Sequence, residues 1–326
     1  MPGLVVDIHA HLTPERFRKA VESGSTWHGL GPETGELENP RNLEGVGERV
    51  ASMDSIGVDV QAVSTTDCFY CYDKDVATTV AIARDANDEL AEMSHDCPDR
   101  FIGLGSLPLQ DVKASITELD RIMSDLQLKG VMIDDYVNGR TFDEPEFLPL
   151  WEAIEGHGAV VLFHQGAPTV VTCLTNRWFL PNSVGNLANR VLTFGSLVFG
   201  GVIDRFPKLK LCLGHAGGYT AMGVDRMDKG WEAGQFDYMS DDVRNLERRP
   251  SEYLRDFYYD TVTYSESTLR YLIDRVGADR VVFGTDYPAP MEVTDAVNWI
   301  RGLESLSEDE KQAILSDNPA RLLGLG

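Results

Sequence analysis

Short apolar runs alternate with longer amphipathic segments along most of the chain. Apolar runs bounded by turn-forming residues predict buried strands, and apolar residues spaced three and four apart predict helices. The predicted strands cover residues 4–8, 58–64, 101–104, 130–133, 159–163, 209–213, 257–260 and 281–283. The predicted helices cover residues 46–56, 75–95, 111–126, 145–156, 184–200, 218–229, 266–276, 292–303 and 307–323. Strands and helices therefore alternate, which is typical of parallel β/α units.

Eight strands with intervening helices over 326 residues predict an α/β fold, a (β/α)8 TIM barrel formed by residues 1–326 as a single domain. Three stretches interrupt the alternation and are predicted insertions after strands 1, 5 and 6: residues 13–47, 165–205 and 230–250. The first of these is rich in glycine, proline and glutamate and predicts a long loop. A doubly wound open sheet is the main alternative, but no glycine-rich phosphate loop follows the first strand.

Charge and cysteine content narrow the possible partners. With 52 acidic and 29 basic residues the net charge is −23, which repels nucleic acid and anionic membranes. A carboxylate substrate would therefore need specific arginines at its site. The five cysteines are scattered, and Cys68 and Cys71 are the one closely spaced pair. We expect reduced thiols in a cytoplasmic protein, because no signal peptide or membrane-spanning run is visible.

Histidines gather where the predicted strands end. His9 and His11 lie at the end of the first strand, and side chains two apart on a strand point the same way. His164 follows the fifth strand, His215 the sixth, and Asp286 the eighth. A lone His-x-His is more often incidental than not. Because four of the seven histidines fall at strand ends, where barrels carry their chemistry, the set predicts a site for zinc or another divalent metal.

This pattern resembles the amidohydrolase superfamily, and within it the branch of α-amino-β-carboxymuconate-ε-semialdehyde decarboxylase and related decarboxylases. The resemblance covers nearly the whole chain in order. The segments that carry it are Val6-Asp7-Ile8-His9-Ala10-His11, Gly57-Val58-Asp59-Val60-Gln61-Ala62, Arg100-Phe101-Ile102-Gly103-Leu104-Gly105, Phe206-Pro207-Lys208-Leu209-Lys210, His215-Ala216-Gly217-Gly218 and Gly284-Thr285-Asp286-Tyr287-Pro288.

The resemblance implies one divalent metal, usually zinc with manganese as an alternative. Its implied ligands are His9, His11, His164 and Asp286. The implied catalytic residues are His215 and Asp286, with His215 as acid and base toward metal-activated water, a role that suits an imidazole. Strand four ends in Asp134 and Asp135 and carries no lysine there, so we expect a mononuclear site unless those aspartates substitute.

The resemblance also implies arginines that bind the substrate carboxylate, for which a guanidinium fork is well suited. Arg226 matches an arginine that the partner subunit donates in these decarboxylases, which implies a homodimer. A surface arginine paired with Asp225 or Asp228 is an equally good interpretation. Further candidates from residues 165–205 are Arg177, Arg190 and Trp178, although packing is the more common duty of a tryptophan.

The chain departs from the family pattern around the substrate. The fifth-strand histidine is followed by Gln165-Gly166 in place of proline, and Ala216 replaces a glycine. An arginine expected upstream of the second strand has no match, since Arg41 and Arg49 are out of register. These departures leave the metal ligands unchanged and leave the substrate open.

Taken together, the pattern favours a metal-dependent, O2-independent decarboxylase of a small unsaturated or aromatic carboxylic acid. The same activated water would serve a hydrolase of a lactone or amide, or a hydratase of an unsaturated acid, so these remain alternatives. A binding protein without catalytic activity is a third possibility, disfavoured by the complete ligand set with an adjacent base.

Overall fold

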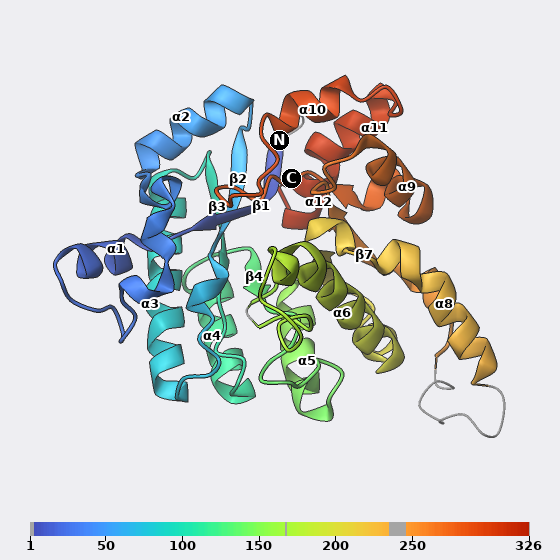
Figure 1. Cartoon of the computed structure of the whole chain (residues 1–326), viewed down its shortest axis with the longest axis horizontal. Coiled ribbons are helices and arrows are strands. Elements are labelled where there is room, and N and C mark those ends of the chain that lie inside the picture. Colours follow the sequence, from blue (N-terminus) through green and yellow to red (C-terminus); the bar gives the residue numbers. More distant parts are fainter. Residues whose placement is uncertain (1–2, 167, 235–245, 326) are drawn as a thin grey trace.

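Eight parallel strands form the centre of the protein, shown here as a computed structural model that describes residues 3–166, 168–234 and 246–325 (Figure 1). The strands pair side by side in sequence order, as predicted. They are β1 Val6–Leu12, β2 Val60–Thr65, β3 Phe101–Gly105, β4 Gly130–Ile133, β5 Val160–Phe163, β6 Lys210–Leu213, β7 Phe257–Asp260 and β8 Val281–Val282. Nearly every strand residue is buried, as expected for a parallel sheet covered by helices. The predicted α/β class is confirmed.

The sheet curls, so that β1 meets the residues that follow β8. The Ile8 amide donates to the Phe283 carbonyl at 3.0 Å, and Ala10 forms a parallel bridge with Tyr287. The Asp286 amide donates to the His9 carbonyl at 2.9 Å. Residues from the two ends of the chain are thereby placed side by side, which positions Asp286 against β1.

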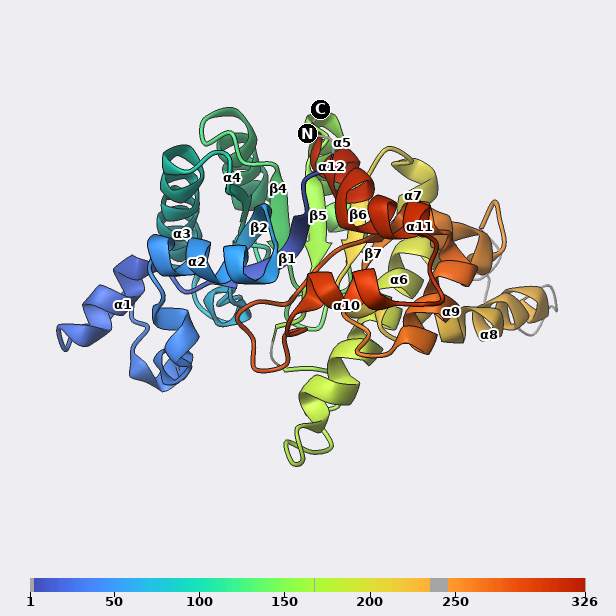
Figure 2. The same cartoon turned by 90° about the horizontal axis from the view of Figure 1, so that it is seen from above.

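Helices cover the outside of the sheet (Figure 2). They are α1 Glu15–Glu22, α2 Val46–Ile56, α3 Val76–Asp96, α4 Val112–Ser124, α5 Leu148–His157, α6 Leu187–Phe199, α7 Val202–Arg205, α8 Thr220–Ala233, α9 Glu266–Val276, α10 Ala296–Gly302, α11 Glu308–Gln312 and α12 Asn318–Leu323. Side-chain caps fix several starts: Asp75 accepts from the Thr78 amide at 3.0 Å, and Asp111 accepts from the Ala114 amide at 2.9 Å.

The structure corrects the prediction at both ends of the chain. The first strand was expected to end at residue 8 but continues to Leu12, because His9 and His11 are themselves strand residues that face the interior. Residues 13–47 were expected to be a loop, yet they contain α1. This short helix has one buried residue, Phe17, whose ring packs 5.2 Å from that of Phe69. Packing against a distant aromatic residue, which periodicity does not reveal, therefore stabilises α1.

The last helices are shorter than predicted. The helix expected at 292–303 begins only at Ala296. The helix expected at 307–323 consists of α11, a π-helical segment Ala313–Asp317, and α12. The predicted insertion at 230–250 lies partly outside the described residues. Within the part of the chain that the structure describes, no helix has the length and apolar character needed to cross a bilayer. All five cysteines are free thiols.

Candidate metal centre

Three imidazoles and one carboxylate converge at the centre of the sheet's carboxyl edge. The Nε2 atoms of His11 and His9 lie 3.2 and 3.3 Å from Asp286 Oδ1, and His164 Nε2 lies 3.8 Å from the same oxygen. One donor atom from each of the four residues lies within 4.8 Å of the others. Of the described residues, this is the one group of histidine, cysteine and acidic side chains close enough to hold a metal ion.

Three strands supply these side chains. His9 and His11 are two residues apart on β1, so both side chains face the interior. His164 directly follows β5. Asp286 stands four residues after β8, with φ of 63°, a left-handed conformation that turns its carboxylate toward β1. The sequence-predicted ligands are therefore brought together as a group, and the chain presents one divalent metal site.

The burial of the ligand side chains and the negative charge of Asp286 favour the binding of a cation at the site. Burial lowers the pKa of His9, but the carboxylates of Asp286 and Asp260 outweigh this effect and raise that pKa to about 10. Burial holds the pKa of His164 well below its usual value. Although burial opposes it, the surrounding histidines hold the pKa of Asp286 well below its ordinary range. The buried His9 Nε2 atom makes no hydrogen bond, which fits a nitrogen that is available for a metal ion.

A second buried carboxylate, Asp260 at the end of β7, connects two functional histidines. Its Oδ2 atom accepts from His9 Nδ1 at 2.6 Å and from the His215 amide at 2.8 Å. Its Oδ1 atom accepts from the Ala216 and Val262 amides at 2.7 and 3.0 Å. A carboxylate that accepts from the far nitrogen of a ligand histidine fixes the tautomer and ring orientation. Asp260 thus orients His9 and the turn that carries His215.

Asp7 has a comparable role on the other side of β1. Its Oδ1 accepts from the amides of His9 and Thr285 at 3.0 and 3.1 Å. Its Oδ2 accepts from the Thr285 hydroxyl at 2.7 Å and from Gln61 Nε2 at 2.9 Å. Burial raises the pKa of Asp7. Because Thr285 precedes Asp286, these bonds fix the position of the carboxylate ligand.

His215 lies beside the metal cluster but outside it. Its Nε2 atom is 3.5 Å from Asp286 Oδ2. His215 and Ala216 adopt left-handed φ values of 54° and 55°, which few non-glycine residues do. Gly218 is also left-handed, and a Cβ there would lie 2.2 Å from the Leu187 carbonyl oxygen. The turn after β6 thus needs glycine at position 218, whereas it accommodates alanine at 216.

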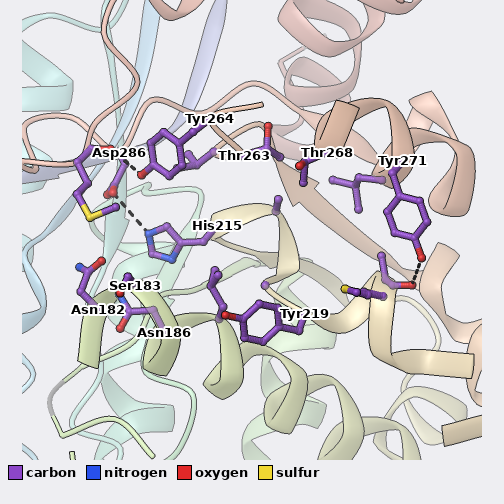
Figure 3. Close-up of a pocket in the computed structure, with 18 of the residues that line it drawn as sticks. Asn182, Ser183, Asn186, His215, Tyr219, Thr263, Tyr264, Thr268, Tyr271 and Asp286 are labelled. Atoms are coloured by element: carbon purple, nitrogen blue, oxygen red, sulfur yellow. Dashed lines mark hydrogen bonds and ion pairs between the residues drawn. The ribbon is translucent and has the colours of Figure 1, made fainter. Parts of the chain in front are cut away.

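A cavity of about 720 Å³ opens from His215 and Asp286 (Figure 3). Its walls come from the π-helical turn Pro181–Asn186, from the start of α8, from residues 262–264 and from α9. The lining is mostly apolar. An apolar cavity with a few convergent polar groups is the usual form of a small-molecule site.

The predicted substrate-binding residues lie outside this cavity wall. Arg226 is exposed on α8 and pairs with neither Asp225 nor Asp228, which instead contact Arg275 and Ser251. Arg177 is exposed and stacks 4.3 Å from the ring centroid of Trp178, which is itself 73% exposed. The structure therefore places these side chains at the surface of the subunit, and their role in binding stays a prediction.

Arg190 is buried in a charged network behind the metal ligands. Its guanidinium pairs with Asp135 and donates to Gln165 Oε1 at 2.7 Å. Asp134 accepts from the Gly166 amide at 2.8 Å. Burial, together with the neighbouring Asp135, raises the pKa of Asp134 to about 7. Asp135 forms an ion pair with Arg190, and Asp134 accepts from the Gly166 amide. Neither aspartate therefore joins the ligand cluster.

Sequence reasoning missed Asp260 and Asp7. Asp260 ends the strand predicted at 257–260, so the rule that selected the histidines, a polar residue at a strand end, would also have selected it. Asp7 gives no comparable signal. It lies inside an apolar strand, and its partners Gln61 and Thr285 are distant in sequence.

Comparisons with known proteins agree with this geometry. A family model described as "Amidohydrolase" matches residues 6–325. The 2-amino-3-carboxymuconate-6-semialdehyde decarboxylase of Dictyostelium discoideum is 33% identical over 279 residues, 85% of this chain and 76% of that protein. The crystal structure of 5-carboxyvanillate decarboxylase from Sphingomonas paucimobilis superposes with a TM-score of 0.86 at 28% identity, over 98% of this chain and 99% of that one. A dihydroxybenzoic acid decarboxylase from Polaromonas sp., solved with bound manganese, has a TM-score of 0.84 at 23% identity, over 100% of this chain and 98% of that one.

Proposed function

This chain belongs to the amidohydrolase family, and from that premise we propose that it is a metal-dependent, O2-independent decarboxylase of a small aromatic or unsaturated carboxylic acid. The observation that carries the proposal is the buried ligand cluster with His215 beside it at the end of an apolar cavity. The relatives from Dictyostelium and Sphingomonas are decarboxylases of different acids. The carboxy-lyase reaction is thus what they share, while the substrate varies.

Decarboxylation breaks the bond between the carboxylate and its carbon, releases CO2 and places a proton on the carbon that held it. A divalent metal ion supplies an electrophilic centre that binds oxygen ligands and stabilises negative charge. His215 Nε2, facing the cavity 3.5 Å from Asp286 Oδ2, is the group placed to hold and move that proton. Asp260 and the turn at His215 keep this imidazole in position.

We propose zinc as the metal, because three imidazoles and one carboxylate are donors that zinc accepts readily. Manganese, which the Polaromonas enzyme binds, is the alternative. A hydrolase or hydratase would use the same ligands, but the relatives from Dictyostelium and Sphingomonas are decarboxylases, so this alternative is not favoured.

We also propose a homodimer in which Arg226 of one subunit reaches the cavity of the other. An exposed guanidinium with no ion pair to any described residue, one helical turn beyond the cavity residue Met222, supports this. Mixing Arg226→Ala chains with His215→Ala chains tests it. Half of the mixed dimers would be hybrids with one intact site, so activity should recover to about a quarter of the wild-type level. Continued inactivity of the mixture would exclude shared sites.

The complete (β/α)8 barrel as one domain, with insertions at 13–47, 165–205 and 230–250, is part of the same proposal. The hydrogen bonds between β1 and residues 283–287 support closure of the barrel. The α1 helix and the segment containing α6 and α7 fall within the first two of these ranges.

Release of CO2 from a panel of hydroxybenzoic and unsaturated acids is the direct test of the activity. The metal-loaded protein should release CO2 without consuming O2, and His215→Ala should lower the rate by about 100- to 10,000-fold. His157→Ala is the matched control, because His157 contacts Asp120 at the surface. Hydrolysis of lactones or amides with no CO2 release would overturn the proposal.

A further inference from the structure

The turn that carries Asp286 is held by contacts from outside the sheet. β8 ends at Val282, so this ligand lies four residues beyond the last strand residue. The backbone of β1 secures one side of the turn, since the His11 amide donates to the Tyr287 carbonyl at 2.6 Å. The Tyr287 side chain, in a residue that is only 3% exposed, is the point at which a second part of the chain reaches the turn.

That second part is residues 39–49, which we call the clamp segment. Asn39 Nδ2 donates to the Pro288 carbonyl at 2.8 Å, and the Tyr287 hydroxyl donates to Glu44. The segment runs from a short 3-10 helix into the start of α2. Most of it belongs to the first predicted insertion, yet it is attached directly to the residues that follow a metal ligand.

Two arginines of the clamp segment lie over the Tyr287 ring. The guanidinium carbons of Arg41 and Arg49 are 4.5 and 4.8 Å from the ring centroid. Arg41 also pairs with Glu292, farther along the same turn. A guanidinium over an aromatic face is attracted by the quadrupole of the ring. The ring next to Asp286 is therefore held both by its hydroxyl and by its face.

Arg49 also contacts the backbone of a second metal ligand. Its Nη1 atom donates to the His11 carbonyl at 2.6 Å, and its Nε atom donates to Gln61 Oε1 at 2.8 Å. Gln61 in turn donates to Asp7, the carboxylate that supports β1. One planar group thus touches the backbone of His11 and the side chain that follows Asp286.

The fold alone gives little reason to bury a cation at position 49. Arg49 is 4% exposed, and it forms no ion pair with any residue that the structure describes. A buried charge without a carboxylate partner loses its hydration, and an apolar side chain of similar size would fill the space more favourably. What a guanidinium adds is a set of donors in a fixed plane. Because these donors meet His11 and Gln61, they point to a duty at the metal centre.

We propose that Arg49 and Tyr287 are positioning residues of the metal centre. Arg49 fixes the backbone of His11, and Tyr287, held by the clamp segment, fixes the turn that carries Asp286. Ligands from the two ends of the chain are thereby kept in place relative to each other. The inference goes beyond the proposed function, because it concerns the geometry of the metal site whichever acid reacts there.

Variants of Arg49 test the first contact through metal binding in the absence of substrate. Arg49→Met removes both donors, and we expect Zn2+ affinity, measured by competition with a chelator, to fall about 10- to 100-fold. Arg49→Lys keeps the charge but loses the planar fork, so it should recover only part of this loss. The visible absorption of the Co2+-loaded protein should change in Arg49→Met, because it reports the arrangement of the ligands.

Arg121→Met is the matched control. Arg121 is also largely buried, but it joins α3 to α4 through Asp88 and Glu118. This variant should lose stability toward denaturant while it keeps the wild-type Zn2+ affinity and Co2+ spectrum. Wild-type metal binding in Arg49→Met, or an equal loss of affinity in Arg121→Met, would overturn the inference.

Variants of Tyr287 test the second contact and do not depend on the folding of the Arg49 variants. Tyr287→Phe keeps the ring and loses only the bond to Glu44, so Zn2+ affinity should stay within about three-fold of the wild type. Tyr287→Leu removes the ring from both guanidinium groups and should lower the affinity about ten-fold. Equal affinities in these two variants would overturn the role of the ring. Wild-type protein that bound metal but released no CO2 from any acid would instead refute the proposed function and leave this inference standing.

Discussion

The metal centre and the cavity wall are built in opposite ways. At the metal centre the side chains are charged or chargeable and buried, and two of the ligands contact a second residue through the far ring nitrogen: His9 contacts Asp260 and His11 contacts Ser64. Along the cavity wall the side chains are neutral; some are buried, such as Leu272 at 3%, and others are exposed, such as Tyr264 at 51% and Met222 at 76%. Ligands supported by further hydrogen bonds keep a fixed geometry. This chain thus joins a reaction centre of fixed geometry to a cavity wall whose side chains are less constrained.

Strained, left-handed backbone conformations occur at the reaction centre, and one residue of the cavity wall also adopts one. His215, Ala216 and Asp286 all adopt left-handed φ values, and all three lie at the reaction centre. Such conformations persist where the surroundings over-determine them, and here the hydrogen bonds to Asp260 do so. Tyr264, with φ of 56°, is the exception on the wall, and its hydroxyl is tied to the Met291 carbonyl at 2.6 Å.

Removing one metal ligand should have the largest effect on metal binding and on activity. We expect His11→Ala to reduce bound metal from one per chain to nearly none, and kcat/KM by at least about 1,000-fold, because stabilisation of negative charge is lost. Metal content by mass spectrometry and CO2 release measure the two effects. His28→Ala provides the control, since His28 lies in the early segment against Asp85. Full activity in metal-free His11→Ala would refute the centre described above.

Removing a support should cost less than removing a ligand. Asp260→Asn keeps the size of the side chain but replaces one acceptor oxygen by a donor NH2 group, which cannot serve His9 Nδ1 and the His215 amide as before. We expect metal affinity to fall about 10- to 100-fold, as for other supporting carboxylates. Competitive metal titration measures it. Asp256→Asn, at an Arg248 ion pair just before the amino end of β7, should bind metal as the wild type does. An unchanged affinity in Asp260→Asn would mean that β1 alone orients His9.

The buried charged network behind the metal ligands should make the free energy of unfolding depend on pH. Because burial and the neighbouring Asp135 raise the pKa of Asp134 to about 7, the folded state binds this proton more tightly than the unfolded state does. Its stabilising contribution is therefore complete below pH 4 and is lost as pH rises through about 7. Asp134→Asn stays neutral, so it should exceed the wild type in stability at pH 8 by of the order of 2 kcal/mol and match it near pH 4.

Denaturant unfolding at the two pH values measures this difference. Asp73→Asn, at an exposed position three residues before α3, supplies the control and should show no such divergence. A destabilised Asp134→Asn at pH 8 would mean that the ionised carboxylate is needed by the Gly166 amide.

The metal centre was predictable because strand ends are visible in sequence. A polar residue directly after an apolar run marks the edge where barrel residues meet, and this alone located His164 and grouped it with His9, His11 and Asp286. The family resemblance then supplied the class of reaction.

What could not be predicted depends on partners distant in sequence. Arg190 is a candidate for substrate binding in the sequence, but in the structure it pairs with Asp135, 55 residues away, and no periodicity reveals that pairing. Helix α1 was missed for the same reason, since its one buried residue is Phe17.

The smallest expected effect concerns the one strained residue on the wall. Tyr264→Phe removes only the hydroxyl that donates to the Met291 carbonyl, and half of this side chain is exposed. We expect a loss of about 1 kcal/mol of stability and less than a three-fold change in kcat/KM, because a single hydrogen bond near solvent contributes little. Thermal unfolding and CO2 release from the preferred acid measure both. A loss of activity in Tyr264→Phe as large as the loss in Asp260→Asn would mean that the hydroxyl takes part in the reaction. Tyr264 would then belong to the rigid reaction centre and not to the adaptable cavity wall.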